Sequence, residues 1–223
     1  MRIRHKPWAR PELAACPFYV KDPEAMRQFW HYSFPRQLHL CLELGCGKGG
    51  FLAKTAAADP GTNYVGVDIK SEVLALAKRS IESVYEQQEK APDNILITSF
   101  EAALIDRYFS PEDTVSRIYI NFPNPWPKER HKKRRLTHTR QLRKYRAFMS
   151  DSSDIVFKTD DGPLFCDTLG YLETSGFKVV LASENYHSDF PDSLSPKTEH
   201  EQMFMEQGLQ IFYIEAVKRD LTD

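Results

Sequence analysis

The sequence has no long run of apolar residues. Although 41% of its 223 residues are hydrophobic, no stretch approaches the roughly 20 apolar residues that a membrane-spanning helix needs. The stretch MRIRHKPWARPELAACPFYV at the N-terminus is interrupted by Pro, Glu and Arg before an apolar segment long enough for a signal peptide can form. We therefore expect a cytoplasmic protein without a membrane segment.

Cysteine is also scarce. The chain contains Cys16, Cys41, Cys46 and Cys166, which form no CxxC pair and do not stand at metal-ligand spacing from the histidines. They suit a reducing compartment, in which they would be small buried apolar side chains. The sequence therefore predicts no metal centre.

Internal repeats, low-complexity segments and signs of a second domain are absent as well. The length and the apolar fraction are sufficient for one α/β domain with a buried core. We expect a single domain over residues 1–223, in which residues 1–37 form a helix-containing arm whose order and packing the sequence does not define.

Short apolar runs, rich in β-branched residues and leucine, predict seven strands. They lie at residues 38–44, 63–69, 94–98, 116–121, 154–159, 177–182 and 209–217. Residues 71–89 have apolar side chains at helical spacing, and Ser71 stands where a residue would cap the helix. Such alternation indicates a Rossmann-like α/β fold, with a seven-stranded, mostly parallel sheet covered by helices on both faces. The last two strands have no obvious helix between them and are expected to form an antiparallel edge.

A glycine-rich loop, ELGCGKGG, follows the first predicted strand. It contains Glu43 and then Gly45, Gly47 and Gly50, at the point where α/β sheets bind nucleotide-like ligands. The spacing fits the GxGxxG of dinucleotide enzymes and the GxGxG of methyltransferases, and an ordinary tight turn would also use glycine. Glu43 favours S-adenosylmethionine, because a carboxylate here would repel a pyrophosphate but would face an ammonium and a sulfonium.

Two more acids follow the second and third predicted strands. Asp68 stands where a carboxylate accepts hydrogen bonds from the ribose hydroxyls of either class of cofactor. Glu101 is placed to lie over an adenine edge, although an acid at a helix N-terminus also gains from the helix dipole without any ligand. The order of strand, acid, glycines and second acid supports a nucleoside site more strongly than any single residue does.

The loop NFPNPWPK after the fourth predicted strand is rigid and aromatic. Its three prolines restrict the backbone and push Asn124 and Trp126 towards extended geometry. The loop would lie across the sheet from the glycines, facing the reactive part of a cofactor. A guanine could stack on the aromatic ring, while its edge finds partners such as Asn124, Asp160 or Glu201.

These residues also have plain structural explanations. Large aromatic side chains are mostly packing residues, so Trp126 is equally expected to anchor the neighbouring basic segment to the core. Asp160 and Asp161 precede a predicted helix and suit N-caps, while Thr198 and Glu201 have the spacing of a capping box. The residues by themselves leave both explanations open.

Residues 128–146 concentrate positive charge. They hold ten of the thirty Lys and Arg against one acid, Glu129, whereas the whole chain has a net charge of −1. A solvated helix face or a localisation tag would not need this density, because like charges at i and i+4 destabilise a helix. We expect a polyanion to compensate the charge, and a nucleic acid backbone would do so with release of counterions.

The motifs LELGCGKG, NFPNPWPKERHKKRRL, KTDDG and TEHE together resemble the bacterial tRNA (guanine-N7-)-methyltransferase family. The resemblance covers nearly the whole chain after residue 38, and PWPK followed by RHxKRRL is its most specific element. It implies a class I methyltransferase fold and the transfer of a methyl group from S-adenosylmethionine to N7 of a guanosine in the variable loop of tRNA.

The resemblance also implies three groups of site residues. The group expected to bind S-adenosylmethionine is Glu43, Asp68 and Glu101, together with Gly45, Gly47 and Asn124, and Asn124 is also the catalytic position. The substrate group is Lys128, Asp160, Thr198 and Glu201. The group expected to contact RNA is Arg130, His131, Lys132, Lys133, Arg134 and Arg135.

The chain departs from the family at Asn124, where members often have Asp. An asparagine argues against a charged base here, and guanine N7 needs none because it has a lone pair and no proton. Two other functions compete. An amino methyltransferase acting on adenine or cytosine would have an Asn-Pro-Pro-aromatic loop, but Trp126 stands in place of the second proline. An RNA-binding module without catalysis would not need Glu43 and Asp68.

Overall fold

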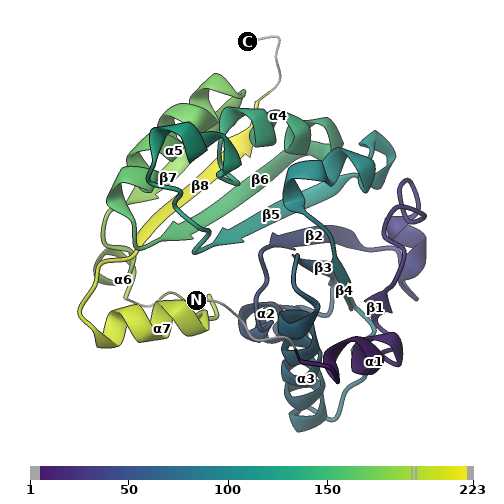
Figure 1. Ribbon diagram of the computed structural model, residues 1–223. Helices are drawn as coiled ribbons and strands as arrows, with labels where there is room; N and C mark the ends of the chain where they lie inside the picture. Colours follow the sequence, from purple (N-terminus) through teal and green to yellow (C-terminus); the bar gives the residue numbers. More distant parts are fainter. Residues whose placement is uncertain (1–5, 192, 194, 220–223) are drawn as a thin grey trace.

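The centre of the molecule is an eight-stranded sheet, seen in a computed structural model that describes residues 6–191, 193 and 195–219 (Figure 1). The strands are β1 (Tyr19–Val20), β2 (His39–Leu44), β3 (Thr62–Asp68), β4 (Ile95–Ser99), β5 (Val115–Asn121), β6 (Met149–Thr159), β7 (Phe177–Ser183) and β8 (Phe212–Lys218). Their order across the sheet is β1-β4-β3-β2-β5-β6-β8-β7. The strands from β1 to β6 pair in parallel, and β8 is antiparallel to both β6 and β7. The prediction of a mostly parallel sheet with an antiparallel edge is confirmed.

The strand count of seven was too low by one. All seven predicted strands are present within a few residues, and the extra strand is β1, which pairs with β4 in the register Tyr19 to Ile97. Two residues are too few to produce a periodic pattern in the sequence. This strand exists because the N-terminal arm reaches the free edge of β4.

Helices pack against both halves of the sheet (Figure 1). They are α1 (Ala9–Ala14), α2 (Gly50–Ala58), α3 (Ser71–Gln87), α4 (Thr139–Phe148), α5 (Gly162–Thr174), α6 (Tyr186–Asp189) and α7 (Glu199–Glu206), with 3-10 helices at Trp30–Ser33, Ala102–Arg107, Pro111–Asp113 and Glu129–Arg134. Figure 1 shows α1, α2 and α3 beside the strands from β1 to β4, whereas α4 and α5 lie by the strands from β5 to β8. Within the described ranges, no helix is both long and apolar enough to span a membrane.

The start of α3 differs from the prediction. Ser71 is the first helical residue, and the N-cap is Lys70, whose side chain makes no capping hydrogen bond. The backbone N–H of Lys70 instead donates to Asp68 Oδ1 at 3.0 Å, so the turn before the helix is held by the acid that ends β3. The predicted apolar face is confirmed, because Val73, Leu74, Ala77, Ile81 and Tyr85 are buried and Val84 packs half-buried against the core.

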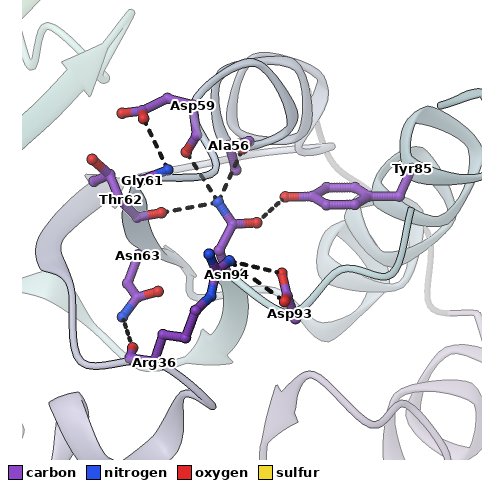
Figure 2. A network of polar contacts seen from close by, with 9 residues as sticks. All are labelled: Arg36, Ala56, Asp59, Gly61, Thr62, Asn63, Tyr85, Asp93 and Asn94. Atoms are coloured by element: carbon purple, nitrogen blue, oxygen red, sulfur yellow. Dashed lines mark hydrogen bonds and ion pairs between the residues drawn. The ribbon is translucent and has the colours of Figure 1, made fainter. Parts of the chain in front are cut away.

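A buried asparagine holds the far ends of α2 and α3 together. The Asn94 side chain donates to the carbonyl oxygens of Ala56, Asp59 and Thr62 at 3.0, 3.2 and 2.9 Å, and it accepts a hydrogen bond from the Tyr85 hydroxyl at 2.5 Å (Figure 2). A buried amide left without these partners would cost about 1–3 kcal/mol. The network therefore fixes the turn between α2 and β3, at the opposite end of β3 from Asp68.

The described part of the N-terminal arm packs into the core. Trp30 is fully buried, stacks on Phe109 at 5.0 Å and donates its indole N–H to the carbonyl oxygen of Tyr108 at 2.8 Å. Residues 1–5 lie outside the described residues. Three of the four cysteines are buried as expected, but Cys166 on α5 is exposed.

A second, smaller apolar cluster lies under α6. Tyr186 of α6 stacks on Tyr213 of β8, with ring centroids 4.3 Å apart, and Val156 and Ile211 complete the buried part. Phe204 of α7 packs against its edge. The C-terminal helices are therefore held on the sheet by a core of their own.

Candidate active site

The glycine loop turns at the carboxyl end of β2. Gly47 has φ of +56°, and its N–H donates to Asp68 Oδ2 at 3.2 Å. Gly49 has φ of +74°, and a Cβ there would lie 2.8 Å from the Cβ of Ala77. A side chain at position 49 would therefore push α3 away from the start of α2, which explains the glycine at this point of close approach.

Glu43 is a buried acid with one polar partner. Its side chain lies at the end of β2 with 2% exposure, and its Oε1 accepts a hydrogen bond from Asn121 Nδ2 at 3.0 Å. Burial raises the pKa of Glu43 to about 7, against the opposing effect of the Asn121 hydrogen bond, and the nearby Asp68 raises it further. Glu43 Oε2 and Asn121 Oδ1 have no hydrogen-bond partner among the described residues. Two buried acceptors without partners indicate a binding position for a donor or a cation.

Asp68 is held by backbone groups on both sides. Its two oxygens accept hydrogen bonds from the N–H groups of Gly47 and Lys70. Burial raises the pKa of Asp68, and these two hydrogen bonds oppose the shift. The carboxylate is therefore fixed in orientation, with lone pairs left for further donors.

A cavity of about 660 Å³ lies beside this loop, beyond the carboxyl ends of β3 and β4. Its wall contains Gly45, Asp68, Glu101 and Asn124, which were expected from the sequence to bind one ligand, and it also contains Trp126. Glu43 and Gly47 do not line the cavity, although the Gly47 N–H donates to Asp68, which does. A larger open groove, of about 1320 Å³, lies at the amino ends of β2, β3, β5 and β6 and contains no predicted site residue.

The loop after β5 has a different shape from the predicted one. Trp126 is not extended but has φ of +43°, because the Asn124 side chain accepts a hydrogen bond from the Trp126 N–H at 3.0 Å and closes a tight turn. The indole is half-buried and lies outside both apolar clusters. Its partners are His131, edge-on at 5.7 Å, and the Arg134 guanidinium, 5.1 Å above the ring. Trp126 is therefore a surface aromatic on the cavity wall and not a core anchor.

The basic segment is not one continuous helix. It forms a 3-10 helix at Glu129–Arg134, becomes extended at Arg135 and starts α4 at Thr139. The break is held by a hydrogen bond of 2.8 Å between the buried hydroxyls of Thr137 and Thr168. The interruption relieves the i, i+4 repulsion that the cations would have in one continuous helix.

Four of the ten cations in this segment form ion pairs or hydrogen bonds with other residues of the chain. Lys132 pairs with Glu129 and Asp167 at 3.0 and 3.1 Å, and Lys144 pairs with Asp106 at 2.6 Å. The other two, Arg135 and Arg146, donate to backbone carbonyl oxygens.

Arg135 in particular was expected to contact RNA, but in the structure its side chain is bonded within the protein. Its side chain is 3% exposed and donates to the carbonyl oxygen of Pro125 at 2.7 Å and to Asp167 at 2.5 Å. The arginine therefore fastens the loop that carries Asn124 and Trp126 to α5.

Six cations of the segment make no ion pair with any described residue: Lys128, Arg130, Lys133, Arg134, Arg140 and Arg143. Lys133, Arg134 and Arg140 also line the cavity. Positive charge without an ion pair to a described residue therefore lies along the cavity, and α4 contributes to it although only residues 130–135 were predicted.

The expected substrate residues fall into two groups. Lys128 and Asp160 are exposed, and their side chains have no hydrogen-bond partner among the described residues. Thr198 and Glu201 instead form the capping box of α7, with Glu201 N–H donating to Thr198 Oγ1 at 2.9 Å and Thr198 N–H to Glu201 Oε2 at 3.1 Å. Asp161 is the N-cap of α5 and accepts from the Leu164 N–H at 2.7 Å.

Two residues of the site were missed by the sequence analysis. Asn121 holds Glu43, and its position at the end of β5, beside β2 in the sheet, was the available signal. Lys158 lies in an apolar strand with 1% exposure, and a lysine at that place in the run DIVFKT was the signal for a buried cation. In the part of the chain that the structure describes, no three His, Cys, Asp or Glu side chains form a group that could hold a metal ion.

Several solved structures that share this fold are methyltransferases. The 16S rRNA methyltransferase KamB aligns with a TM-score of 0.60 at 12% identity, over 82% of this chain and 88% of that chain. An S-adenosylmethionine dependent methyltransferase from Mesorhizobium loti aligns with a TM-score of 0.53 at 14% identity, over 81% and 91%. At these identities the likeness concerns the fold, which is that of the class I methyltransferases.

The sequence relatives define the group within that class. The family model described as putative methyltransferase matches residues 37–214. The tRNA (guanine-N(7)-)-methyltransferase of Clostridium beijerinckii is 48% identical over 98% of this chain and 99% of its own length. The same enzyme of Clostridium perfringens is 49% identical over 98% and 100%. The chain belongs to the tRNA (guanine-N(7)-)-methyltransferase family.

Proposed function

We propose that the protein transfers the methyl group of S-adenosylmethionine to N7 of a guanosine in the variable loop of tRNA. The observation that carries the proposal is a cavity lined by Asp68, Glu101 and three cations, together with a pair of buried acceptors at the ends of β2 and β5 that have no partner among the described residues. The relatives' name supplies the base and the atom. A tRNA substrate also favours the cytoplasm as the place of action.

S-adenosylmethionine fits the chemistry of the residues at the glycine loop. Glu43 Oε2 and Asn121 Oδ1 are buried acceptors, and the cofactor carries an ammonium and a sulfonium to complement them. Asp68 is oriented by two backbone N–H groups and has lone pairs left for ribose hydroxyls. Glu101 lies on the same wall as Asp68 and suits the adenine edge.

When bound, the cofactor would supply an electrophilic methyl group. The lone pair of guanine N7 would form a bond to the methyl carbon while the bond from that carbon to sulfur breaks, which leaves the sulfur as a thioether. Guanine N7 has no proton to lose, so no residue of this chain has to act as a general base. What remains for the protein is alignment of the reacting atoms, which can contribute several kcal/mol. Asn124 serves alignment, because its side-chain oxygen sets the turn that carries Trp126 along the cavity wall.

The unpaired cations suit the phosphates of tRNA. Lys133, Arg134 and Arg140 line the cavity, and Arg143 lies one helical turn beyond Arg140 on α4. Contacts with phosphates position the RNA without selecting its sequence. Lys128 and Asp160, both exposed and without partners among the described residues, remain suited to the nucleoside itself.

The test is a product analysis. The protein is incubated with labelled S-adenosylmethionine and unmodified tRNA, and the tRNA is digested to nucleosides. We expect the label in 7-methylguanosine. Label on an exocyclic amine of adenine or cytosine would identify an amino methyltransferase instead, and cofactor and tRNA binding without any label in the RNA would identify a module without catalysis.

A further inference from the structure

A buried ion pair joins the end of the sheet to the C-terminal helices. Lys158 of β6 is 1% exposed, and its Nζ lies 3.0 and 3.1 Å from the two carboxylate oxygens of Glu201 on α7, which is fully buried. Burial lowers the pKa of Lys158, and the Glu201 carboxylate opposes this shift. Fully buried charges are rare in proteins unless they are paired, so each of these two residues depends on the other.

Lys158 also holds α6. Its ammonium lies 5.0 Å from the ring centre of Tyr186, over the aromatic face, and His187 Nε2 lies 2.8 Å from Glu201 Oε1, without the alignment of a hydrogen bond. The lysine is therefore the point at which β6, α6 and α7 meet. Glu201 is fully buried, and both of its carboxylate oxygens accept hydrogen bonds within the protein, from Lys158 and from the Thr198 N–H of the capping box.

The first turn of α7 lies against both halves of the site. Glu199 forms an ion pair of 2.8 Å with Lys48 of the glycine loop, and a Cβ on Gly50 would lie 3.6 Å from the Glu199 carboxylate. His200 stacks on Phe122, which begins the loop carrying Asn124, with ring centroids 6.2 Å apart. The first turn of α7 thus contacts the glycine loop on one side and the loop that carries Asn124 on the other.

We propose that Lys158 is a positioning residue for methyl transfer, and this rests on the proposed function. By holding Glu201, Lys158 fixes the first turn of α7 against the loop after β5. The part of the site that would receive the guanosine therefore has its shape before tRNA binds. Glu201, expected from the family resemblance to serve the substrate, then also acts through the position of this turn.

The experiment compares Lys158→Met, Lys158→Arg and Lys218→Met in the full-length protein. Lys218 is the matched control, because it donates to the carbonyl oxygen of Met149 at 2.6 Å and pairs with Asp151 at 3.5 Å at the opposite end of β6. For each variant, the folded fraction, kcat and KM for tRNA, the Kd for S-adenosylmethionine and hydrogen exchange in α7 are measured.

We expect Lys158→Met to lower kcat/KM for tRNA by about ten- to a hundredfold per folded molecule, the range expected when reacting groups are misplaced. The Kd for the cofactor should change less than about threefold, α7 should exchange faster, and Lys158→Arg should recover most of the activity. Lys218→Met should lower the melting temperature and leave both constants unchanged.

The proposal is overturned if folded Lys158→Met keeps the kcat/KM of the wild type, since the pair would then serve stability alone. It is also overturned if Lys218→Met loses as much activity as Lys158→Met. Should Lys158→Met not fold, Glu201→Gln keeps the capping box and removes the charge, and a drop in kcat/KM with unchanged cofactor affinity is expected there. The proposed function fails separately, when the wild type makes no 7-methylguanosine.

Discussion

The proposed cofactor side of the site consists of acids at strand ends, whereas the proposed RNA side consists of exposed cations on a loop and a helix. Glu43 and Asp68 are held by hydrogen bonds from neighbouring strands and turns, so each has one orientation. Lys133, Arg134 and Arg143 have no ion pair to a described residue and are exposed. We therefore expect single substitutions to change the affinity for the cofactor, whereas the affinity for tRNA should depend on the total charge of several cations.

The basic segment shows why a count of charges is not a map of a binding surface. Lys132 and Lys133 are neighbours in the sequence, yet Lys132 pairs with Glu129 and Asp167 while Lys133 lines the cavity. Arg134 and Arg135 differ in the same way. Neighbouring cations therefore have separable roles, which the predictions below are designed to test.

The largest effect is expected on the RNA side, from changing Lys133, Arg134, Arg140 and Arg143 together to Ala. If each contacts a phosphate, the slope of log K against log salt should fall by roughly three to four, and KM for tRNA should rise about a hundredfold or more near 0.1 M salt. The affinity for S-adenosylmethionine should not change. The salt dependence of tRNA binding checks this, with Lys132→Ala as the control that leaves the slope nearly unchanged. If the slope of log K against log salt is the same in the quadruple variant as in the wild type, these four cations are solvated and do not contact phosphates.

On the cofactor side, Asp68→Ala should weaken S-adenosylmethionine binding by about ten- to a hundredfold, the loss of two hydrogen bonds to a charged acceptor. Calorimetric titration measures the affinity. The salt slope of tRNA binding should stay at its wild-type value, which separates the two sides of the site. Equal cofactor affinity in the variant and the wild type would remove Asp68 from the nucleoside site.

Asn124 lies between the two sides, and Asn124→Ala should lose roughly tenfold in kcat, because the turn that carries Trp126 loses its hydrogen bond. Asn124→Asp should keep comparable activity, since a carboxylate accepts the same bond from the Trp126 N–H. The kcat of the wild type at saturating cofactor should have no acidic limb near neutral pH. A limb that disappears on removal of one carboxylate or histidine would demonstrate a general base.

The smallest effect concerns pH and Glu43. Because burial raises the pKa of Glu43 to about 7, the carboxylate is largely protonated at lower pH and loses its attraction for the cofactor cation. Affinity for S-adenosylmethionine should fall several-fold, and at most about tenfold, for one pH unit below 7. Titrations across this range check it, and Glu43→Gln should bind more weakly and without the pH dependence.

The same shift affects stability without the cofactor. The folded protein keeps a proton on Glu43 that the unfolded chain releases between its ordinary pKa of 4.5 and about 7, so stability from this group falls as pH rises through that window. The whole effect is about 3 kcal/mol. Unfolding experiments should therefore find cofactor-free Glu43→Gln more stable than the wild type above neutral pH. If the wild type is the more stable protein above neutral pH, burial does not raise the pKa of Glu43.

The sequence by itself determined most of the sheet and the grouping of several predicted cofactor residues around one cavity. Seven strands were predicted, because strands buried on both faces are continuous apolar runs, and β1 was missed because two residues make no pattern. Asp68 and Glu101 were placed at the same cavity because the carboxyl ends of parallel strands meet at one edge of the sheet.

Only the tertiary structure decided which charges are free and which are buried. Asn121 meets Glu43 across 78 residues, Lys158 meets Glu201 across 43, and Arg135 meets Asp167 across 32. None of these partners lies within the spacing of a helix or a turn, so no local pattern records them. A charge in a sequence has a sign, but its burial and its partner depend on which distant segments pack beside it. For that reason the sequence predicted a cationic surface, and the fold alone separated its exposed cations from the arginine that holds the loop in place.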